Sequence, residues 1–212
     1  MKKMVIISIA AIVVFYLFKQ FVYKPYAWKK AIASPEHRLQ LGSFIFSRQR
    51  GSNGSQSMEN KYFIFKAIEI NGDYVRLSVV RQLSHKNKLL QSDFSTTKES
   101  YKDLKQNIKK LTITAIIKED LYKEGASFTI NNYLLTQYPS LAMSRYYYED
   151  IAEVKKNLPP PADGYERQEY FSMLYSKKEI VENAKLIPYT LNNSTEPQLA
   201  ERLSENIELI LN

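Results

Sequence analysis

The chain of 212 residues is long enough for one domain of ordinary size together with a membrane anchor. Hydrophobic residues make up 44% of it and charged residues 25%, which is typical of a globular protein and argues against a wholly disordered chain. The sequence contains no cysteine, and this excludes disulfides, thiolate catalysis and cysteine-ligated zinc.

The net charge of +8 is concentrated at the N-terminus. No acidic residue precedes Glu36, and six lysines lie in the first 30 residues: Lys2, Lys3, Lys19, Lys24, Lys29 and Lys30. Residues 31–212 therefore carry a net charge of only +2. Because a nearly neutral domain is a poor surface for phosphates, we expect no nucleic-acid partner.

The first apolar segment runs from Met4 to Phe18 and has Ser8 as its single hydrophilic residue. Lys19 and Gln20 interrupt it, and three apolar residues then follow, up to Tyr23. Counted over residues 4–23, the segment reaches the ~20 residues that span a bilayer, because Lys19 can extend its ammonium to the interface. We therefore predict a lipid bilayer as the partner of residues 4–23.

The residues after this segment suit the membrane surface. We predict that Tyr23, Tyr26 and Trp28 form an aromatic belt at the membrane interface. We expect Lys24, Lys29 and Lys30 to contact lipid head groups. Pro25 is expected to end or kink the helix. Residues 1–30 are thus predicted to be a transmembrane anchor with a basic juxtamembrane flank.

Two other interpretations of the N-terminus are a cleaved secretory signal and a buried helix of a soluble protein. The best cleavage site is Ala31-Ile32-Ala33 before Ser34, but about ten residues and three lysines separate it from the apolar core. We therefore expect an uncleaved anchor. The Met-Lys-Lys start resembles a bacterial signal-anchor, which places the domain outside the cytoplasm, whereas the lysines of the far flank favour the opposite orientation. We predict a single-pass protein with an extracytoplasmic, periplasmic domain.

The clearest β signals lie in the first half of the domain. Ser43–Ser47 suits a short strand, and Lys61–Ile70 and Asp73–Gln82 are rich in β-branched and aromatic residues. Asn71-Gly72 between the last two predicts a two-residue hairpin with a type I′ turn. The glycine- and serine-containing stretch Arg48–Asn60 is expected to be a flexible loop, since its spacing matches no phosphate-binding fingerprint.

A helix is predicted after the capping box Thr96-x-x-Glu99, because apolar residues follow at helical spacing from Tyr101 to Leu111. Its lysine stripe is interpreted as a solvated face, with an acidic partner or a lipid surface as the alternative: Lys98, Lys102, Lys105 and Lys109. The alternating residues of 111–117 suit another strand, and residues 126–130 are a candidate to pair with it.

The second half of the domain is predicted to be helical. Helices are expected from Pro139 to about Asn157, around Phe171 to Tyr175, after the capping box Ser176-x-x-Glu179, and from Pro197 to Leu211. The predicted fold class is therefore α+β: one transmembrane helix, then a soluble domain over 31–212 with a small antiparallel sheet in a sheet-rich part, 43–130, and a helical part, 139–212.

No set of residues predicts catalysis or a metal site. His37 and His85 are the only histidines, and a triad of Ser84, His85 and Asp93 is disfavoured because neighbouring strand residues face opposite sides. Three carboxylate pairs have no recognisable catalytic or calcium-binding spacing: Glu119-Asp120, Glu149-Asp150, and Glu166 with Glu169. We expect no catalytic residue, no cofactor and no metal.

The run Tyr146-Tyr147-Tyr148 is the least usual feature. If the run is helical, successive residues step by about 100° and the three rings cannot share one buried stripe. Because tyrosine is enriched in protein interfaces, the three residues are candidate partner-binding residues. Burial beneath neighbouring helices and stacking on a carbohydrate are the alternatives.

The sequence thus favours a non-enzymatic, membrane-anchored protein of a bacterial envelope whose extracytoplasmic domain binds a protein partner. It would be an accessory subunit of an envelope complex or an immunity protein that neutralises a toxin. The alternatives are a membrane-tethered hydrolase with a carboxylate site and a cytoplasm-facing membrane scaffold.

Overall fold

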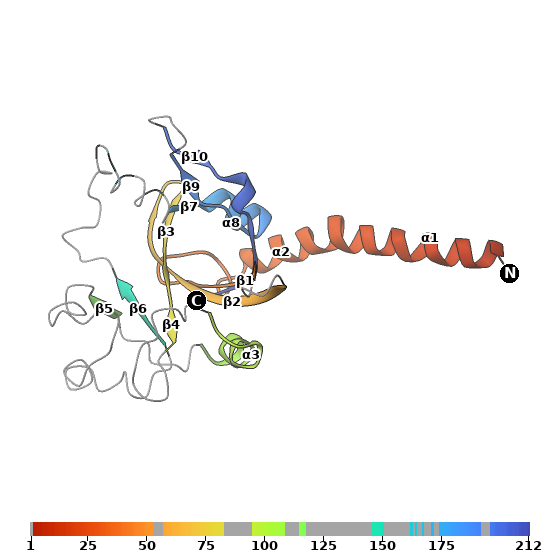
Figure 1. The fold of residues 1–212 in the computed structure, drawn as a ribbon, viewed down its shortest axis with the longest axis horizontal. Coiled ribbons are helices and arrows are strands. Elements are labelled where there is room, and N and C mark those ends of the chain that lie inside the picture. The colour runs from red at the N-terminus through yellow and green to blue at the C-terminus, as the bar shows by residue number, and fades with distance from the viewer. Residues whose placement is uncertain are drawn as a thin grey trace.

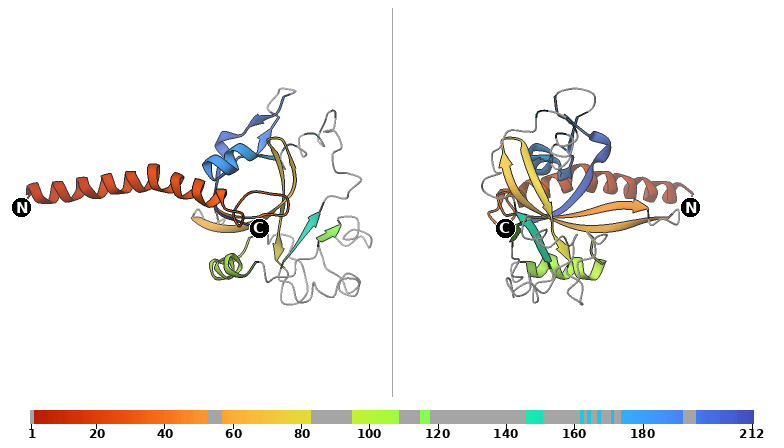
Figure 2. Two further views of the ribbon diagram at one scale, coloured as in Figure 1. Left: turned by 180° about the vertical axis from the view of Figure 1, so that it is seen from behind. Right: turned by 60° about the vertical axis from the view of Figure 1, so that its left-hand side comes forward.

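The structure is a computed structural model, and it describes residues 2–52, 57–82, 95–108, 115–117, 146–150, 174–191 and 196–212, with residues 162, 164, 167 and 171. Within these ranges the chain forms a long N-terminal helix and a sheet that curls into a nearly closed barrel (Figure 1). The helix projects from one side of the barrel, and its N-terminal end lies far from the rest of the protein (Figure 2).

The N-terminal helix is continuous through three segments. They are α1 (Lys2–Phe18), a π-helical turn (Lys19–Tyr23) and α2 (Lys24–Ala33). Of the two expectations for Pro25, an end of the helix is wrong, since α2 continues for eight residues beyond it, and a kink stays a prediction. In the π-turn directly before Pro25, the Lys24 N–H bonds to the Lys19 carbonyl. In an ordinary α-helix, a proline ring clashes with the preceding turn. The π-turn before Pro25 is wider, so it accommodates the ring and the helix continues.

Six antiparallel strands form the main sheet in the order β7-β3-β2-β1-β11-β8. Their bounds are β1 Phe44–Ser52, β2 Met58–Asn71, β3 Tyr74–Val79, β7 Leu174–Ser176, β8 Lys185–Leu186 and β11 Glu205–Leu211. The two edges of this sheet meet, because Tyr175 of β7 forms an antiparallel bridge with Pro188, just beyond β8. The Ser176 N–H also donates to the Ile187 carbonyl over 3.2 Å. These contacts bring the sheet close to a closed barrel.

The predicted α+β fold with a helical C-terminal half is wrong. The segment from Pro197 to Leu211 forms β10 (Gln198–Leu199), a single 3-10 turn (Glu201–Leu203) and β11. β11 pairs with β1 over Phe44–Arg48, with a register shift between Phe46 and Ser47. Its helical spacing of apolar residues is overridden because β1 needs a hydrogen-bonding partner along its open edge.

Two other segments of the predicted helical half are also strands. Tyr146–Asp150 is β6, which pairs with β4 (Arg81–Gln82) and with β5 (Ala115–Ile117) in a small three-stranded sheet. Leu174–Ser176 is β7 of the barrel. β9 (Tyr189–Thr190) pairs with β10. The helix predicted after Ser176 is confirmed as α8 (Lys177–Asn183), with the Ser176 side chain as its N-cap.

The predicted β2–β3 hairpin is confirmed, but its turn is one residue further on. Asn71 pairs with Tyr74, so the two turn residues are Gly72 and Asp73 rather than Asn71 and Gly72. Gly72 has φ +60°, and the one described non-glycine residue with a positive φ is Ala184. A positive φ at the first turn position and a negative one at the second is the pattern of a type II′ turn, not type I′.

Two hydrophobic clusters lie on opposite faces of the sheet. The interior cluster includes Ile45, Phe65, Val75 and Ile210, and α2 and α8 pack against it. The outer cluster lies beneath α3 (Lys98–Asn107) and contains Phe46, Ile64, Ile68, Val80, Tyr101, Leu104, Ile108 and Leu211. Neighbours such as Ile45 and Phe46 thus face opposite sides, as strand geometry requires. α3 confirms the predicted helix, although its N-cap is Thr97 and not Thr96.

The predicted loop over Arg48–Asn60 is mostly strand, because β1 extends to Ser52 and β2 begins at Met58. Several predictions concern residues outside the described ranges: the strand at residues 126–130, the triad of Ser84, His85 and Asp93, the carboxylates at Glu119, Asp120, Glu166 and Glu169, and Lys109 of the lysine stripe.

Candidate functional site

The junction between the N-terminal helix and the barrel has the most definite geometry among the described residues. The Trp28 indole N–H donates to the Val181 carbonyl of α8 over 2.8 Å. Trp28 and Ile32 are half-buried and pack against the interior cluster of the barrel. The last turns of the helix are therefore part of the folded domain and hold α8 in place over the barrel.

The rest of the helix makes no such contact within the described part of the chain. Residues 4–26 are all exposed, and Ile12, Phe15 and Tyr16 have 67%, 68% and 62% of their surface free. Residues 3–33 form one helix that is long and apolar enough to cross a membrane, and no part of its most apolar window is buried. This apolar surface is not covered by the part of the chain that the structure describes, which makes the helix a candidate membrane span.

The predicted membrane-surface residues divide into two groups. Lys24, Lys29, Lys30, Tyr23 and Tyr26 are exposed on the helix, as contact with lipid would require. Trp28 differs from them, because part of its ring and its N–H are engaged with the domain. This contact shows which face of the helix is turned toward the barrel.

A second set of contacts fixes the connector between α2 and β1. The Asn212 amide donates to the carbonyls of Pro35 and Arg38 over 2.6 and 2.8 Å, and its oxygen accepts from the buried Ser43 hydroxyl. His37 Nδ1 lies 2.7 Å from the Ile210 carbonyl. The C-terminal strand is thereby bonded to the segment that follows the helix. His37 is thus explained by a structural contact.

A third set joins the β2–β3 turn to the N-terminus of α8. Asp73 accepts hydrogen bonds from the Ser176 hydroxyl (2.8 Å), the Lys178 backbone N–H (2.7 Å) and the Tyr189 hydroxyl. Partial burial by itself would raise the pKa of Asp73, but the bonds from Tyr189, the Lys178 N–H and Ser176 outweigh it and lower the pKa. Burial and the bond to Asp73 raise the pKa of Tyr189 to about 12.

This cluster has the chemistry of a helix cap and not of an active site. Tyr189 stays protonated at neutral pH and donates to a charged carboxylate, while Ser176 caps the Glu179 N–H over 3.2 Å. A helix N-terminus favours negative charge, and Asp73 provides it. Every bond in the cluster is thus explained by the attachment of α8 to the turn.

On the outer face, Glu208 of β11 forms ion pairs with two basic side chains. Its Oε2 lies 2.9 Å from the Lys105 ammonium of α3, and its Oε1 lies 3.4 Å from Arg48 Nε of β1. Lys105 of the predicted stripe is therefore an ion-pair partner that holds α3 on the barrel. Lys98 and Lys102 are exposed on the same helix, and each is followed by an exposed acid, Glu99 and Asp103.

The predicted partner-binding residues Tyr146, Tyr147 and Tyr148 lie together in β6. The helical geometry used to infer their exposure is therefore wrong. Tyr147 pairs with Arg81, and Tyr146 with Gln82. Their role in binding stays a prediction. In the described residues, no group of three or more metal-ligating side chains comes together.

Sequence reasoning missed the structural roles of Asp73, Trp28 and Asn212. Asp73 carries a weak local signal, since aspartate is common in turns. The partners of Trp28 and Asn212 lie more than 150 positions away in the chain, and no local pattern indicates them. Comparisons of the chain with protein-family models, with curated proteins and with solved structures found no match.

Proposed function

We propose that this protein is a non-enzymatic, membrane-tethered binding protein of a bacterial envelope, and that its barrel domain lies outside the cytoplasm and holds a protein partner. An accessory subunit of an envelope complex and a toxin-neutralising immunity protein are the two versions of this function. In both, confinement at a membrane raises the effective concentration of the domain near its partner.

The contact between Trp28 and Val181 is the observation that supports an uncleaved tether. Cleavage before Ser34 would remove Trp28 and Ile32, and both pack against the interior cluster. The domain would lose a hydrogen bond and part of the cover of its core. A signal sequence is normally discarded without consequence for the mature fold, so this packing favours retention of the helix.

The continuity of the helix into the domain supports a function at the membrane surface. α2 runs without a flexible linker into contact with α8, and the connector after it is bonded to β11. The domain is therefore held near the bilayer in a restricted orientation. A protein that presents one face to a partner in the same membrane would use this arrangement.

The absence of cysteine permits a direct test of the side of the membrane. Leu203 is 57% exposed in the domain, so Leu203→Cys adds one accessible thiol. We expect a membrane-impermeant maleimide to label this variant in cells whose outer membrane has been made permeable and whose inner membrane is intact. Ser8→Cys, within the apolar helix, is the control that should stay unlabelled. Labelling of the Leu203→Cys variant only after cell lysis would instead favour a cytoplasm-facing scaffold, which the lysines that follow the apolar segment also suit.

Binding through the tyrosine run is tested by single alanine variants of Tyr146, Tyr147 and Tyr148. If a ring contacts the partner, its removal should weaken capture of the partner by ~2 kcal/mol or more while the melting temperature changes little. If a ring lies in the core, its removal should instead lower the free energy of unfolding by several kcal/mol. If all three variants are destabilised and still bind normally once folded, the tyrosine run is not the binding surface.

A further inference from the structure

The β1–β2 hairpin extends beyond the barrel as a two-stranded arm. β11 pairs with β1 only as far as Arg48, and β3 pairs with β2 only from Phe65 onward. β1 and β2 nevertheless remain paired along their described length, up to Ser52 opposite Met58. We call residues 48–52 and 58–61 the hairpin arm.

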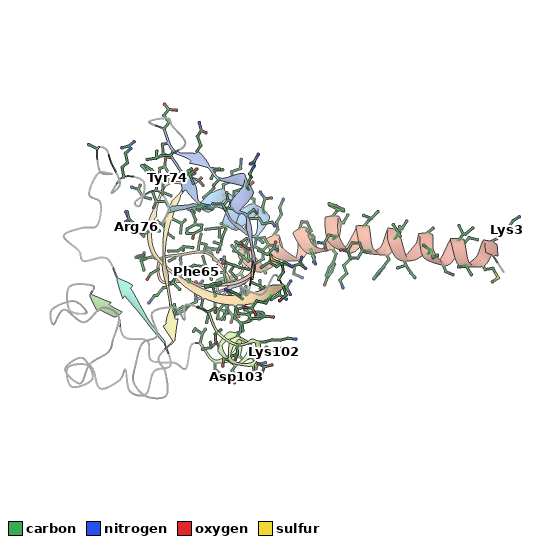
Figure 3. All side chains as sticks on the ribbon, in the orientation of Figure 1. Lys3, Phe65, Tyr74, Arg76, Lys102 and Asp103 are labelled. Atoms are coloured by element: carbon green, nitrogen blue, oxygen red, sulfur yellow. The ribbon has the colours of Figure 1, made fainter. Side chains whose placement is uncertain are left out.

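The hairpin arm points toward the side of the barrel from which α1 leaves. Figure 1 shows its end beside α2, and both views of Figure 2 place it on the α1 side. α3 lies next to it on the outer face, and Lys102 extends from α3 in the direction of α1 (Figure 3). If α1 spans a membrane, the hairpin arm and Lys102 therefore face the bilayer.

Basic side chains predominate on this side. The hairpin arm carries Arg48, Arg50 and Lys61 against one acid, Glu59. Arg48 is paired with Glu208, but Arg50 is exposed. Lys61 pairs with Gln49, so it lies on the opposite face of the arm from Arg50, together with Glu59. On α3, the charges of Glu99 and Asp103 offset those of two of the three lysines. Figure 3 shows, however, that the Asp103 side chain is directed away from Lys102.

Met58 adds an apolar group at the end of the hairpin arm, and 66% of its surface is exposed. Met58 lies on the same face of the arm as Arg50. An exposed methionine beside a cation suits the boundary between lipid head groups and acyl chains. The same boundary is expected near Tyr23 and Tyr26, on the helix that leaves beside the arm.

We infer that Arg50, Met58 and Lys102 form a lipid-facing surface that rests on anionic head groups. This inference depends on the proposed membrane tether but not on the protein partner. The helix holds these cations on the membrane side of the domain, and exposed charges interact over ~10 Å at 0.1 M salt. A basic residue near an anionic surface favours contact by about fivefold.

The orientation favours lipid over other anionic partners. A nucleic acid or an acidic protein would have to enter the space between the domain and the bilayer to reach these residues. The lysines of α2 add charge on the same side: Lys24, Lys29 and Lys30. These three lysines flank the apolar helix, where anionic head groups are also expected.

The test uses the full chain in lipid nanodiscs, with a polarity-sensitive fluorophore on a single introduced cysteine. Met58→Cys places it at the membrane-side end of β2, and Asn71→Cys places it at the other exposed end of the same strand. Figure 3 shows the neighbouring Tyr74 on the side away from α1. Emission and quenching by aqueous iodide are measured in zwitterionic discs and in discs containing anionic lipid.

We expect the probe at position 58 to shift to the blue and to be protected from iodide only when anionic lipid is present. The probe at position 71 should not change. High salt should reverse the effect, because it screens exposed charges. The double variant Arg50→Gln, Lys102→Gln should reduce the equilibrium constant for contact of this surface with anionic lipid by about 30-fold. The matched control, Lys177→Gln with Lys178→Gln, removes two charges beside the β2–β3 turn and should have no effect.

The two hypotheses fail in different ways. If the chain does not incorporate into the discs, the tether itself is wrong. If it incorporates but the probe at position 58 is equally quenched in both lipids, the lipid-facing surface is wrong and the tether stands. A response to an added oligonucleotide or acidic peptide, without a response to anionic lipid, also overturns the inference.

Discussion

The carboxylate of Asp73 accepts a hydrogen bond from the hydroxyl of Ser176, 103 positions later in the chain, with 2.8 Å between Oδ2 and Oγ. Asp73 also binds the Lys178 N–H, and Ser176 caps the Glu179 N–H. Two side chains from distant segments thus satisfy neighbouring free donors at the start of α8. Through α8, this contact supports the helix–barrel junction at Trp28.

Asp73→Asn is expected to destabilise the domain by ~1 kcal/mol at pH 7, as the loss of a helix cap does. Because the folded state lowers the pKa of Asp73, its contribution is complete above the ordinary aspartate value of about 3.9 and is lost as the pH falls through the lower folded pKa. As the pH is lowered from 5 through the folded pKa of Asp73, the free energy of unfolding should therefore fall less for the variant than for the parent. Urea unfolding at several pH values measures this, with Asp103→Asn on the exposed face of α3 as the control.

Gly72→Val is expected to destabilise the domain by roughly 1–3 kcal/mol, because a β-branched residue at φ +60° is strained. A Cβ at position 72 has no atom within 4 Å, so the effect comes from the backbone and not from a clash. Gly51→Ala is the control, since its φ is ordinary and its nearest neighbour is the flexible end of Lys61. Equal thermal stability of Gly72→Val and the parent would contradict the type II′ turn.

A chain that starts at Lys24 should be more stable than one that starts at Ser34. Only the longer chain keeps Trp28 and Ile32, and we expect a difference of ~2 kcal/mol for their packing and the hydrogen bond. Trp28→Phe in the longer chain separates the two contributions, because it retains a ring but removes the N–H donor. Identical urea midpoints for both truncated chains would remove the argument against cleavage.

Ala184→Gly is expected to stabilise the domain by ~1 kcal/mol. Ala184 ends α8 in the left-handed region, at φ +53° and ψ +42°, where glycine is preferred. The same substitution at Ala31, inside α2, should instead cost ~1 kcal/mol because glycine is a poor helix former. Opposite shifts of melting temperature for the two variants would confirm that Ala184 is in the left-handed region. A loss of stability at position 184 would contradict it.

Ile12→Arg should abolish stable anchoring, because a charge near the middle of a bilayer costs ~2.5–3.5 kcal/mol on insertion scales. Ile12→Leu keeps the apolar character and should behave as the parent does. Both proteins are tested by carbonate extraction of membranes. Equal retention of the arginine variant would show that the apolar helix is not the anchor.

The sequence by itself determined the features that depend on near neighbours. The apolar run from Met4 indicates a helix that can cross a membrane, since length and composition decide this. The β2–β3 hairpin follows from Gly72, and the start of α8 follows from Ser176 with Glu179 three positions on. Each of these signals operates within a few residues, where sterics and capping act directly.

Only the tertiary structure decided that the C-terminal segment is a strand. Leu199, Leu203, Ile207 and Leu211 have helical spacing, yet Glu205–Leu211 lies between β1 and β8. Its partner strand β1 lies at the start of the domain, so the competing hydrogen bonds are invisible in a local window. The sequence could not show the junction of Trp28 with Val181 or the cap from Asp73 to α8 for the same reason: packing between distant segments, not local preference, brings these groups together.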